Sequence, residues 1–313
     1  MIEVPSLKEL EKAGFNKVSI ACGNFDGLHL GHQEIINKLL SASKVSASDP
    51  IVLTFHPHPR EVLTGAKVQN LTSQQTKVSL LESLGIKALV TAPFTREFAN
   101  QEAGDFVNEF LLGSNLQVCD LCIGADWKFG KGRKGDVDFL SSGDWDFNVH
   151  PVYELSDQHD VISSSRIRKA LNEADFDKAA ALLGRPYSVT GEVIKGKGIA
   201  NSQLQFPTAN IEISDLYLPL AGVYTCTVKI EESPDSLPAV CNIGHAPTFG
   251  GNENTPASLE VHLLNYSGDL YGKSLNVTFT SFLRAEEKFD NAESLKQQIG
   301  RDVIAAKSHF KIS

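Results

Sequence analysis

Short apolar runs alternate with longer amphipathic stretches over the first half of the chain. The apolar runs have the composition and length of buried strands, and they are Val18–Cys22, Ile51–Phe55, Ala88–Thr91 and Val118–Ile123. Between them, apolar positions recur at helical spacing in Gln33–Lys44, Gln74–Leu84 and Ala103–Leu112. From Lys17 to Leu183 this alternation predicts an α/β domain built on a parallel sheet.

The pattern changes after a helical stretch at Ser165–Leu183, where the sequence Gly-Arg-Pro-Tyr at Gly184–Tyr187 interrupts it. Beyond this break the apolar runs are short, β-rich and separated by Gly, Pro and Asn, which predicts a small antiparallel barrel. The expected strands are Ser188–Ile194, Gly222–Ile230, Ala239–Ile243, Leu259–Leu264 and Ser274–Phe282, and a final helix at Ala292–Ser308 closes the chain. A length of 313 residues suits two domains with separate cores, which we place at residues 1–184 and 185–313.

The net charge of −9 argues against a nucleic-acid partner, because phosphate backbones are held by a broad basic surface. An anionic small molecule needs only a local basic cluster. Two such clusters are present, one formed by Lys128, Lys131, Arg133 and Lys134 and the other by Arg166, Arg168 and Lys169. Each is equally compatible with solvated loop charge when taken alone.

The amino terminus is too charged for a signal peptide, and no apolar run reaches the ~18 residues that span a bilayer. We therefore expect a cytoplasmic protein with no membrane partner, and the sequence leaves its oligomeric state open. Five cysteines, an odd number, suit a reducing compartment. Cys119 and Cys122 form a lone C-x-x-C without a second pair to complete a zinc site, so we expect both to pack in the core as part of a strand.

A glycine-bearing turn and two histidines follow the first expected strand. The segment Gly23–His32 has the sequence GNFDGLHLGH and leads into a helix. Backbone amides at a helix amino terminus attract anions, and glycines let the backbone approach them closely. Imidazoles at this position would donate hydrogen bonds to phosphoryl oxygens as charge develops during displacement at an α-phosphorus. The alternative is a pair of surface histidines beside a loop.

A second segment at another expected helix start, Ile162–Arg168 with the sequence ISSSRIR, favours the phosphate interpretation. Together the two segments resemble the nucleotidyltransferase superfamily. With Thr54–Pro59 (TFHPHP) and Gly124–Gly130 (GADWKFG), the chain resembles the prokaryotic bifunctional riboflavin kinase/FAD synthetases. This resemblance implies a Rossmann-like domain that binds ATP through Gly23, Asn24, Phe25, His29, His32, Ser164, Arg166 and Arg168. It places the flavin near His56, His58, Asp126 and Phe129.

The segment Phe206–Asn210 (FPTAN) resembles the Pro-Thr-Ala-Asn motif of flavokinases, and further segments of that family follow it in order. The resemblance implies that Thr208 and Asn210 hold Mg²⁺, that Gly196 and Gly198 bind ATP, and that Glu260 is the general base. Hydroxyl and amide oxygens are suitable ligands for Mg²⁺. Glu260 lies in an apolar strand, where a carboxylate is costly unless it is paired or used, although a solvent-facing glutamate is the plain alternative.

The resemblance implies ATP-dependent phosphorylation of riboflavin to FMN and adenylylation of FMN to FAD. The expected partners are ATP, riboflavin, FMN, FAD and Mg²⁺. Four departures from the kinase pattern, at Asn201, Ser202, Gln205 and Ala246, leave a monofunctional FMN adenylyltransferase with a weak or inactive kinase domain as the nearest alternative. A flavin-binding sensor without turnover is disfavoured, since it would not need both histidines and both arginines of the triphosphate site.

Overall fold

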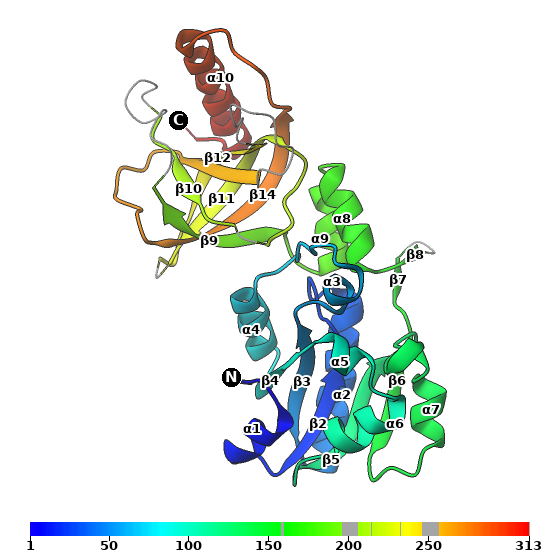
Figure 1. The fold of residues 1–313 in the computed structure, drawn as a ribbon. Coiled ribbons are helices and arrows are strands. Elements are labelled where there is room, and N and C mark those ends of the chain that lie inside the picture. Colours follow the sequence, from blue (N-terminus) through cyan, green and yellow to red (C-terminus); the bar gives the residue numbers. More distant parts are fainter. Residues whose placement is uncertain (158–159, 196–205, 214, 232, 246–256, 313) are drawn as a thin grey trace. The chain divides into compact units, whose positions relative to one another are not determined.

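The computed structural model describes residues 1–157, 160–195, 206–213, 215–231, 233–245 and 257–312. The chain divides into two compact units, Met1–Ser164 and Ser165–Ser313, and each is described here by itself (Figure 1). One unit contains a parallel sheet and the other contains a closed barrel.

The sheet of the first unit is entirely parallel, with the strand order β1-β4-β3-β2-β5-β6. Its strands are β1 (Ile2–Val4), β2 (Lys17–Cys22), β3 (Asp49–His56), β4 (Ala88–Pro93), β5 (Gln117–Gly124) and β6 (Asn148–Val152). The chain runs outward from β2 through β3 to β4, and then returns to place β5 on the other side of β2. This reversal creates a topological switch point between β2 and β5, where open α/β sheets bind ligands at the carboxyl ends of the strands.

Helices cover both faces of this sheet (Figure 1). They are α1 (Leu7–Lys12), α2 (Leu30–Ser46), α3 (Pro59–Thr64), α4 (Gln74–Ser83), α5 (Arg96–Ala99), α6 (Ala103–Asp105) with a π-helical continuation at Phe106–Leu111, a 3₁₀ turn at Lys131–Arg133 and α7 (Val137–Ser142). The short strands β7 (Ser156–Asp157) and β8 (Asp160–Val161) pair with each other.

Alternation along the strands divides the buried residues between two cores. On one face Ala21, Val52 and Leu89 pack against Ile36 and other apolar residues of α2 and α4. On the opposite face the strands pack against α1 and the helical segment after Ala103, where aromatic rings follow one another in contact from Phe55 to Phe147. Burial on both faces explains why the strands are nearly continuous apolar runs.

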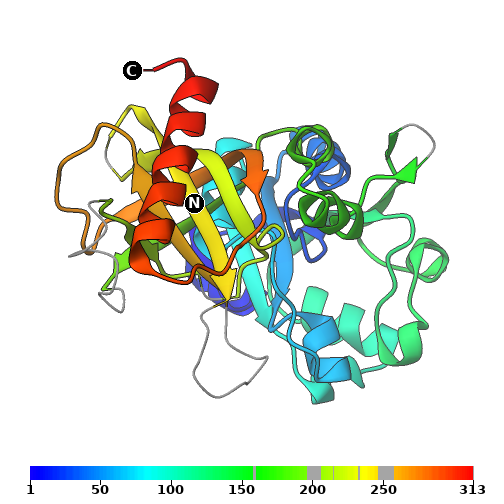
Figure 2. The same ribbon diagram turned by 90° about the horizontal axis from the view of Figure 1, so that it is seen from above.

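The second unit begins with α8 (Ser164–Asn172) and α9 (Phe176–Leu183) and continues into a closed antiparallel barrel, β10-β13-β12-β11-β14-β9. The strands are β9 (Ser188–Ile194), β10 (Ala209–Ile211), β11 (Gly222–Ile230), β12 (Ser236–His245), β13 (Ala257–Leu263) and β14 (Ser274–Arg284). Phe176 of α9 packs its ring against Tyr224 and Phe279 of the barrel. The last helix, α10 (Ala292–Phe310), lies along the outside of the barrel (Figure 2).

The predicted architecture is confirmed, including the parallel sheet, the antiparallel barrel and the final helix. Cys119 and Cys122 are buried, unpaired residues of β5, as the core-packing interpretation required. The stretch Ser165–Leu183 is two helices, because Ala174 adopts a positive φ of 53° that separates α8 from α9. The pattern did not reveal β1, β6 and β10, since each is short and only partly apolar.

Candidate active sites

The histidine-bearing segment begins where β2 ends, at the switch point of the sheet. The turn after β2 uses positive φ values at Phe25 (50°), Gly27 (81°) and Leu28 (42°). Asp26 is buried, and its Oδ1 accepts a hydrogen bond from the Leu71 backbone N–H at 2.7 Å. The Gly27 N–H donates to the Thr72 hydroxyl at 3.2 Å. These two hydrogen bonds stabilise the turn that precedes α2.

His29 is the N-cap residue of α2, and its Nδ1 accepts a hydrogen bond from the His32 backbone N–H at 3.3 Å. An accepting Nδ1 places the ring proton of neutral His29 on Nε2. The two imidazoles stack with their centroids 3.6 Å apart, and the Phe25 ring meets the edge of His32 at 5.3 Å. The predicted histidine pair is therefore one contiguous unit at the amino terminus of a long helix.

His32 has a buried Nδ1 without a hydrogen-bond partner among the described residues. Burial, and to a smaller extent His29 and Lys77, lower the pKa of His32 well below 6.5. The side chain is therefore a neutral imidazole near pH 7. An unpaired buried nitrogen costs free energy, and an incoming ligand would supply its missing partner.

The ISSS segment lies against the turn. The Ser164 hydroxyl donates to the Asp26 carbonyl at 2.9 Å. A Cβ at Gly31 would lie 3.3 Å from the His29 ring and 3.6 Å from the Ile162 carbonyl oxygen, so a glycine permits this close approach. The structure thus brings Ser164 together with the GNFDGLHLGH segment. Arg166 and Arg168 follow on α8 in the second unit, where the Arg168 guanidinium lies 5.5 Å from the Tyr217 ring centroid.

Asn24 connects the turn after β2 to the TFHPHP loop. Its carbonyl accepts hydrogen bonds from the Thr54 hydroxyl at 3.2 Å and from Lys77 Nζ at 3.0 Å. Its side-chain amide lies 3.4 Å from Nε2 of His58. His58 in turn caps α3 by accepting the Arg60 N–H, while His56 is exposed at the end of β3. Lys77 belongs to no sequence motif, and only the fold places it here.

The residues expected on the flavin side follow β5 at the same edge of the sheet. Asp126 is exposed and folds back over Gly124, since a Cβ at that glycine would lie 2.9 Å from its carboxylate. Phe129 is only 8% exposed and stacks on Trp127 with centroids 4.7 Å apart. Phe129 therefore packs beneath Trp127 and is nearly inaccessible, whereas the ring of Trp127 is partly exposed and accessible to a ligand.

Glu260 lies on the outer face of the barrel between two asparagines. Along β13 the residues Leu259, Val261 and Leu263 are buried, so Glu260 and His262 point away from the barrel interior. Glu260 is directly opposite Asn210 of β10 and Asn242 of β12. Residues directly opposite in an antiparallel pair share a face, so the three polar side chains form one row. Burial raises the pKa of the Glu260 carboxyl above its ordinary value of 4.5.

A cavity of about 340 Å³ opens over this row, between the barrel and α10. Its barrel side includes Thr208, Asn242, Glu260 and His262. Its other wall is formed by the end of β14, by the chain that follows and by α10. The residues of this wall are Arg284, Glu286, Glu287, Phe289, Leu295, Ile299, Asp302 and Val303. This volume and mixture of apolar and polar groups suit a small-molecule site. Thr208 also borders a second cavity of about 160 Å³ that Tyr266 and Tyr271 line.

An ion pair fixes the wall formed by α10. Arg284 Nε donates to Asp302 at 3.0 and 3.2 Å, and its Nη2 donates to Asp302 at 2.8 Å. Both side chains are largely buried, and Gln298 adds a hydrogen bond to Asp302 at 3.0 Å. No sequence pattern indicated Asp302, because it lies 18 residues after its partner Arg284 and on a different element.

His262 joins the FPTAN segment to β13. Its Nδ1 lies 2.8 Å from the Pro207 carbonyl oxygen, which can only accept, so Nδ1 carries the proton. Phe206 meets the His262 ring edge-on at 5.6 Å. These contacts position His262 next to the segment that contains Thr208. The predicted kinase residues Gly196 and Gly198, and the departures at Asn201, Ser202, Gln205 and Ala246, lie outside the described residues.

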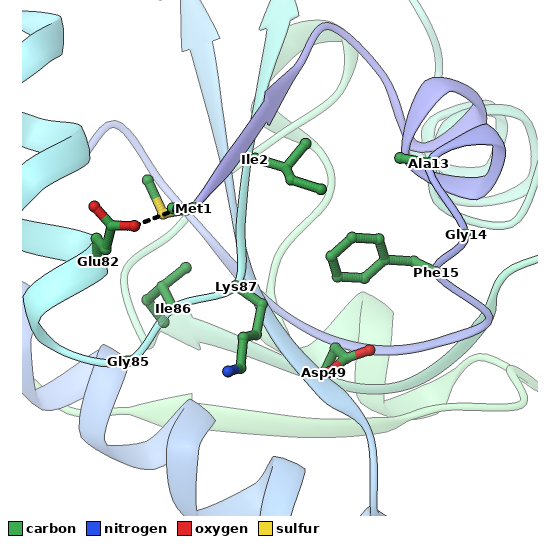
Figure 3. Close-up of a pocket in the computed structure, with 10 residues that line it drawn as sticks. All are labelled: Met1, Ile2, Ala13, Gly14, Phe15, Asp49, Glu82, Gly85, Ile86 and Lys87. Carbon is green, nitrogen blue, oxygen red and sulfur yellow. Dashed lines mark hydrogen bonds and ion pairs between the residues drawn. The ribbon is translucent and has the colours of Figure 1, made fainter.

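Another cavity, of about 520 Å³, lies at the amino ends of the parallel strands, whereas the histidines follow the carboxyl end of β2. Figure 3 shows it between Phe15, Ile2 and Ile86, with the Met1 amino group paired to Glu82. Asp49 and Lys87 mark the amino ends of β3 and β4. Because ligands of open α/β sheets bind at the carboxyl ends of the strands, this cavity is not the candidate active site.

Comparisons with known proteins match both parts of the chain. The FAD synthetase family model matches residues 11–166, and the riboflavin kinase family model matches residues 183–310. A Pseudomonas fluorescens protein named bifunctional riboflavin kinase/FMN adenylyltransferase is 37% identical over 91% of each chain. A Bacillus subtilis protein with the same name is 34% identical over 94% of this chain and 93% of its own.

A crystal structure of a Streptococcus pneumoniae protein, named macrolide-efflux protein, shares the fold with a TM-score of 0.82. It is 26% identical and covers 98% of this chain and 99% of its own. In the part of this chain that the structure describes, no helix is both long enough and apolar enough to cross a bilayer.

Proposed function

The chain belongs to the family of bifunctional riboflavin kinases/FMN adenylyltransferases, and we propose that its two activities are divided at Gly184. The enzyme phosphorylates riboflavin to FMN with ATP, and it transfers the adenylyl group of a second ATP to FMN, releasing pyrophosphate. In our proposal residues 1–184 perform adenylyl transfer and residues 185–313 perform the phosphorylation. Support for the division comes from the histidine pair and Glu260, which belong to different units, and the place of the boundary comes from the riboflavin kinase family model, which begins at residue 183.

In adenylyl transfer, the amino terminus of α2 and the histidine pair bind the triphosphate. An FMN phosphate oxygen attacks the α-phosphorus, the bond to the β-phosphate bridging oxygen breaks, and pyrophosphate leaves. The nucleophile is already anionic, so no general base is required. His29 donates from Nε2 and His32 donates from its ring N–H to oxygens on which charge accumulates. The helix amino terminus adds favourable electrostatics, and Ser164, Arg166 and Arg168 contribute further donors.

We propose that the flavin of FMN occupies the neighbouring surface formed by His56, His58, Asp126 and Phe129. Support comes from the contact of His58 with Asn24, which joins this surface to the phosphate-binding turn. Trp127, stacked on Phe129, gives the surface an aromatic face suited to an isoalloxazine ring.

In riboflavin phosphorylation, Glu260 takes the proton of the ribityl 5′-hydroxyl as that oxygen attacks the γ-phosphorus of ATP and ADP leaves. Burial raises the pKa of Glu260, and a raised pKa makes its carboxylate a stronger base. Thr208 borders both cavities of the barrel, so we place riboflavin in the larger cavity and the nucleotide on the side of the smaller one.

Thr208 and Asn210 are suited to Mg²⁺, because both offer neutral oxygen atoms on the same outer face as Glu260. When bound, the ion neutralises charge on the phosphates of the nucleotide. Asn210 and Asn242 lie on either side of Glu260 in this row. Gly196 and Gly198 complete the proposed nucleotide site.

One assay tests the proposal. The purified chain is incubated with Mg²⁺, ATP and either riboflavin or FMN, and the flavins are separated by chromatography. We expect FAD from both substrates, with FMN as the intermediate from riboflavin. Formation of FAD from FMN but not from riboflavin would identify a monofunctional adenylyltransferase. Absence of any product with either substrate would refute the proposed function.

A further inference from the structure

Lys77 is a charged residue at the adenylyl-transfer site that no motif includes. It lies on α4, between β3 and β4, and its Nζ donates to the Asn24 carbonyl at 3.0 Å. The same carbonyl accepts the Thr54 hydroxyl at 3.2 Å. A side chain of α4 and a side chain of β3 thus donate to the same backbone oxygen of the phosphate-binding turn, the Asn24 carbonyl.

The amino group of Lys77 is buried near charged and titratable residues of the first unit. Burial lowers the pKa of Lys77 below 10.5, and the negative charge of Asp26 acts in the opposite direction. Lys77 and His29 both contribute to the lowered pKa of His32. The Phe25 ring, which carries no charge, meets the edge of His32, and Asp26 is the acidic residue of the same turn.

We propose that Lys77 is a positioning residue of adenylyl transfer, which fixes the phosphate-binding turn through the Asn24 carbonyl and brings its amino group to that turn. The proposal rests on the assignment of the triphosphate to His29 and His32. A neutral donor could satisfy the Asn24 carbonyl, but only a cation also disfavours a proton on His32 and favours an anionic ligand. A neutral His32 keeps one ring nitrogen able to accept while the other donates.

Three substitutions separate these effects. Lys77→Met removes both the hydrogen bond and the charge, Lys77→Gln keeps a donor without charge, and Lys77→Arg keeps both. A misplaced turn costs about 10²-fold in rate, so kcat for FAD formation from FMN should fall about 10²-fold in Lys77→Met. It should fall less in Lys77→Gln and least in Lys77→Arg. Because Glu260 belongs to the other unit, FMN formation from riboflavin should not change in any of them.

A pH profile distinguishes this role from a purely structural one. Loss of the neighbouring cation raises the pKa of His32 toward 6.5, so the acid limb of kcat/KM for FMN should move to higher pH in Lys77→Met and Lys77→Gln. Lys77→Arg should retain the wild-type limb. NMR titration of the histidine signals, with His32 identified from its absence in His32→Ala, gives the same shift without catalysis.

The outcomes separate this proposal from the one on which it rests. If His29→Ala/His32→Ala abolishes FAD formation while Lys77→Met leaves both kcat and the His32 titration unchanged, the role of Lys77 is refuted. If the double histidine variant makes FAD normally, the site assignment itself is wrong. If Lys77→Met fails to fold, the test uses Lys77→Gln instead. A His32 pKa in Lys77→Gln that equals the wild-type value refutes the electrostatic role of Lys77.

Discussion

Asn210 and Glu260 lie directly opposite each other on β10 and β13, with both side chains on the outer face of the barrel. Asn242 occupies the equivalent position on the other side of Glu260. The predicted Mg²⁺ ligand and the predicted general base, about fifty residues apart in the sequence, are therefore neighbours. Burial has raised the pKa of this carboxylate, which makes it a suitable proton acceptor.

Glu260→Gln preserves the size of the side chain and removes the base. We expect FMN formation to fall ~10²–10⁴-fold, because general-base catalysis contributes about that much. FAD formation from added FMN should persist. In the wild-type enzyme the acid limb of the kinase reaction should lie above pH 4.5, the ordinary pKa of glutamate, because the folded carboxyl binds its proton more tightly. Equal loss of both reactions would indicate damage to the fold.

His29→Ala combined with His32→Ala should stop FAD formation and let FMN accumulate from riboflavin. Removal of one donor that stabilises developing charge costs ~10²–10³ in rate, and the pair supplies two such donors. Product analysis by chromatography measures both steps in one reaction. His309→Ala, a change at a histidine of α10 near the carboxyl terminus, is the matched control and should leave FAD formation unchanged.

Loss of the Arg284–Asp302 pair should loosen α10 from the kinase cavity. Asp302→Asn leaves the guanidinium without its charged partner, which costs about 3 kcal/mol for a pair that is mostly buried. We expect a lower free energy of unfolding of the second unit and a raised KM for riboflavin, measured by denaturant titration and kinetics. Glu293→Gln, at an exposed acid of the same helix, should change neither. A riboflavin KM that stays the same in Asp302→Asn would show that this wall does not contact substrate.

Asp120 should make the first unit sensitive to acid. Burial alone would raise the pKa of this carboxyl, but hydrogen bonds from Ser19, His150, Ser46 and Asn148 outweigh it and lower the pKa to about 2. A pKa depressed from 3.8 stabilises the folded state fully above the unfolded value, and the stabilisation is lost as the pH falls through about 2.

Asp120→Asn should therefore destabilise the protein by about 2 kcal/mol at neutral pH, the equivalent of this shift. The difference from wild type should shrink as the pH approaches 2. Urea titrations at several pH values measure it, and Asp49→Asn, at an exposed position, is the control. A difference that does not vary with pH would show that the loss comes from packing and not from the charge.

The kinase step should limit FAD production from riboflavin, with little accumulation of FMN. Ser202 and Ala246 stand where the family resemblance implies cations, and Gln205 replaces an expected glycine. Each missing charge-assisted hydrogen bond of ~1.5–3 kcal/mol should slow transfer or weaken nucleotide binding about tenfold or more. Gln205→Gly and Ala246→Arg should raise the kinase rate in steady-state assays. A wild-type kinase turnover well above that of adenylyl transfer would mean that other residues, such as Lys195 or Lys197, compensate.

The sequence by itself determined the two domain types and the main strands of both. Strand periodicity depends on which neighbours along the chain are buried, and that information is local. The glycine turn before α2 and the histidine cap were also local features, because a helix start depends on a few consecutive residues. The apolar run around Cys119 identified β5 for the same reason.

Only the tertiary structure placed Lys77 beside Asn24. The two residues are far apart in the sequence, and they meet because α4 packs on the sheet next to the turn after β2. The same holds for Asp302, which reaches Arg284 only when α10 lies along the barrel. The row of Asn210, Glu260 and Asn242 depends on the register of β13 with β12 and with β10, which is distant from both in sequence. Register follows from closure of the barrel and from burial on its inner face, and a one-residue slip would turn Glu260 into the core.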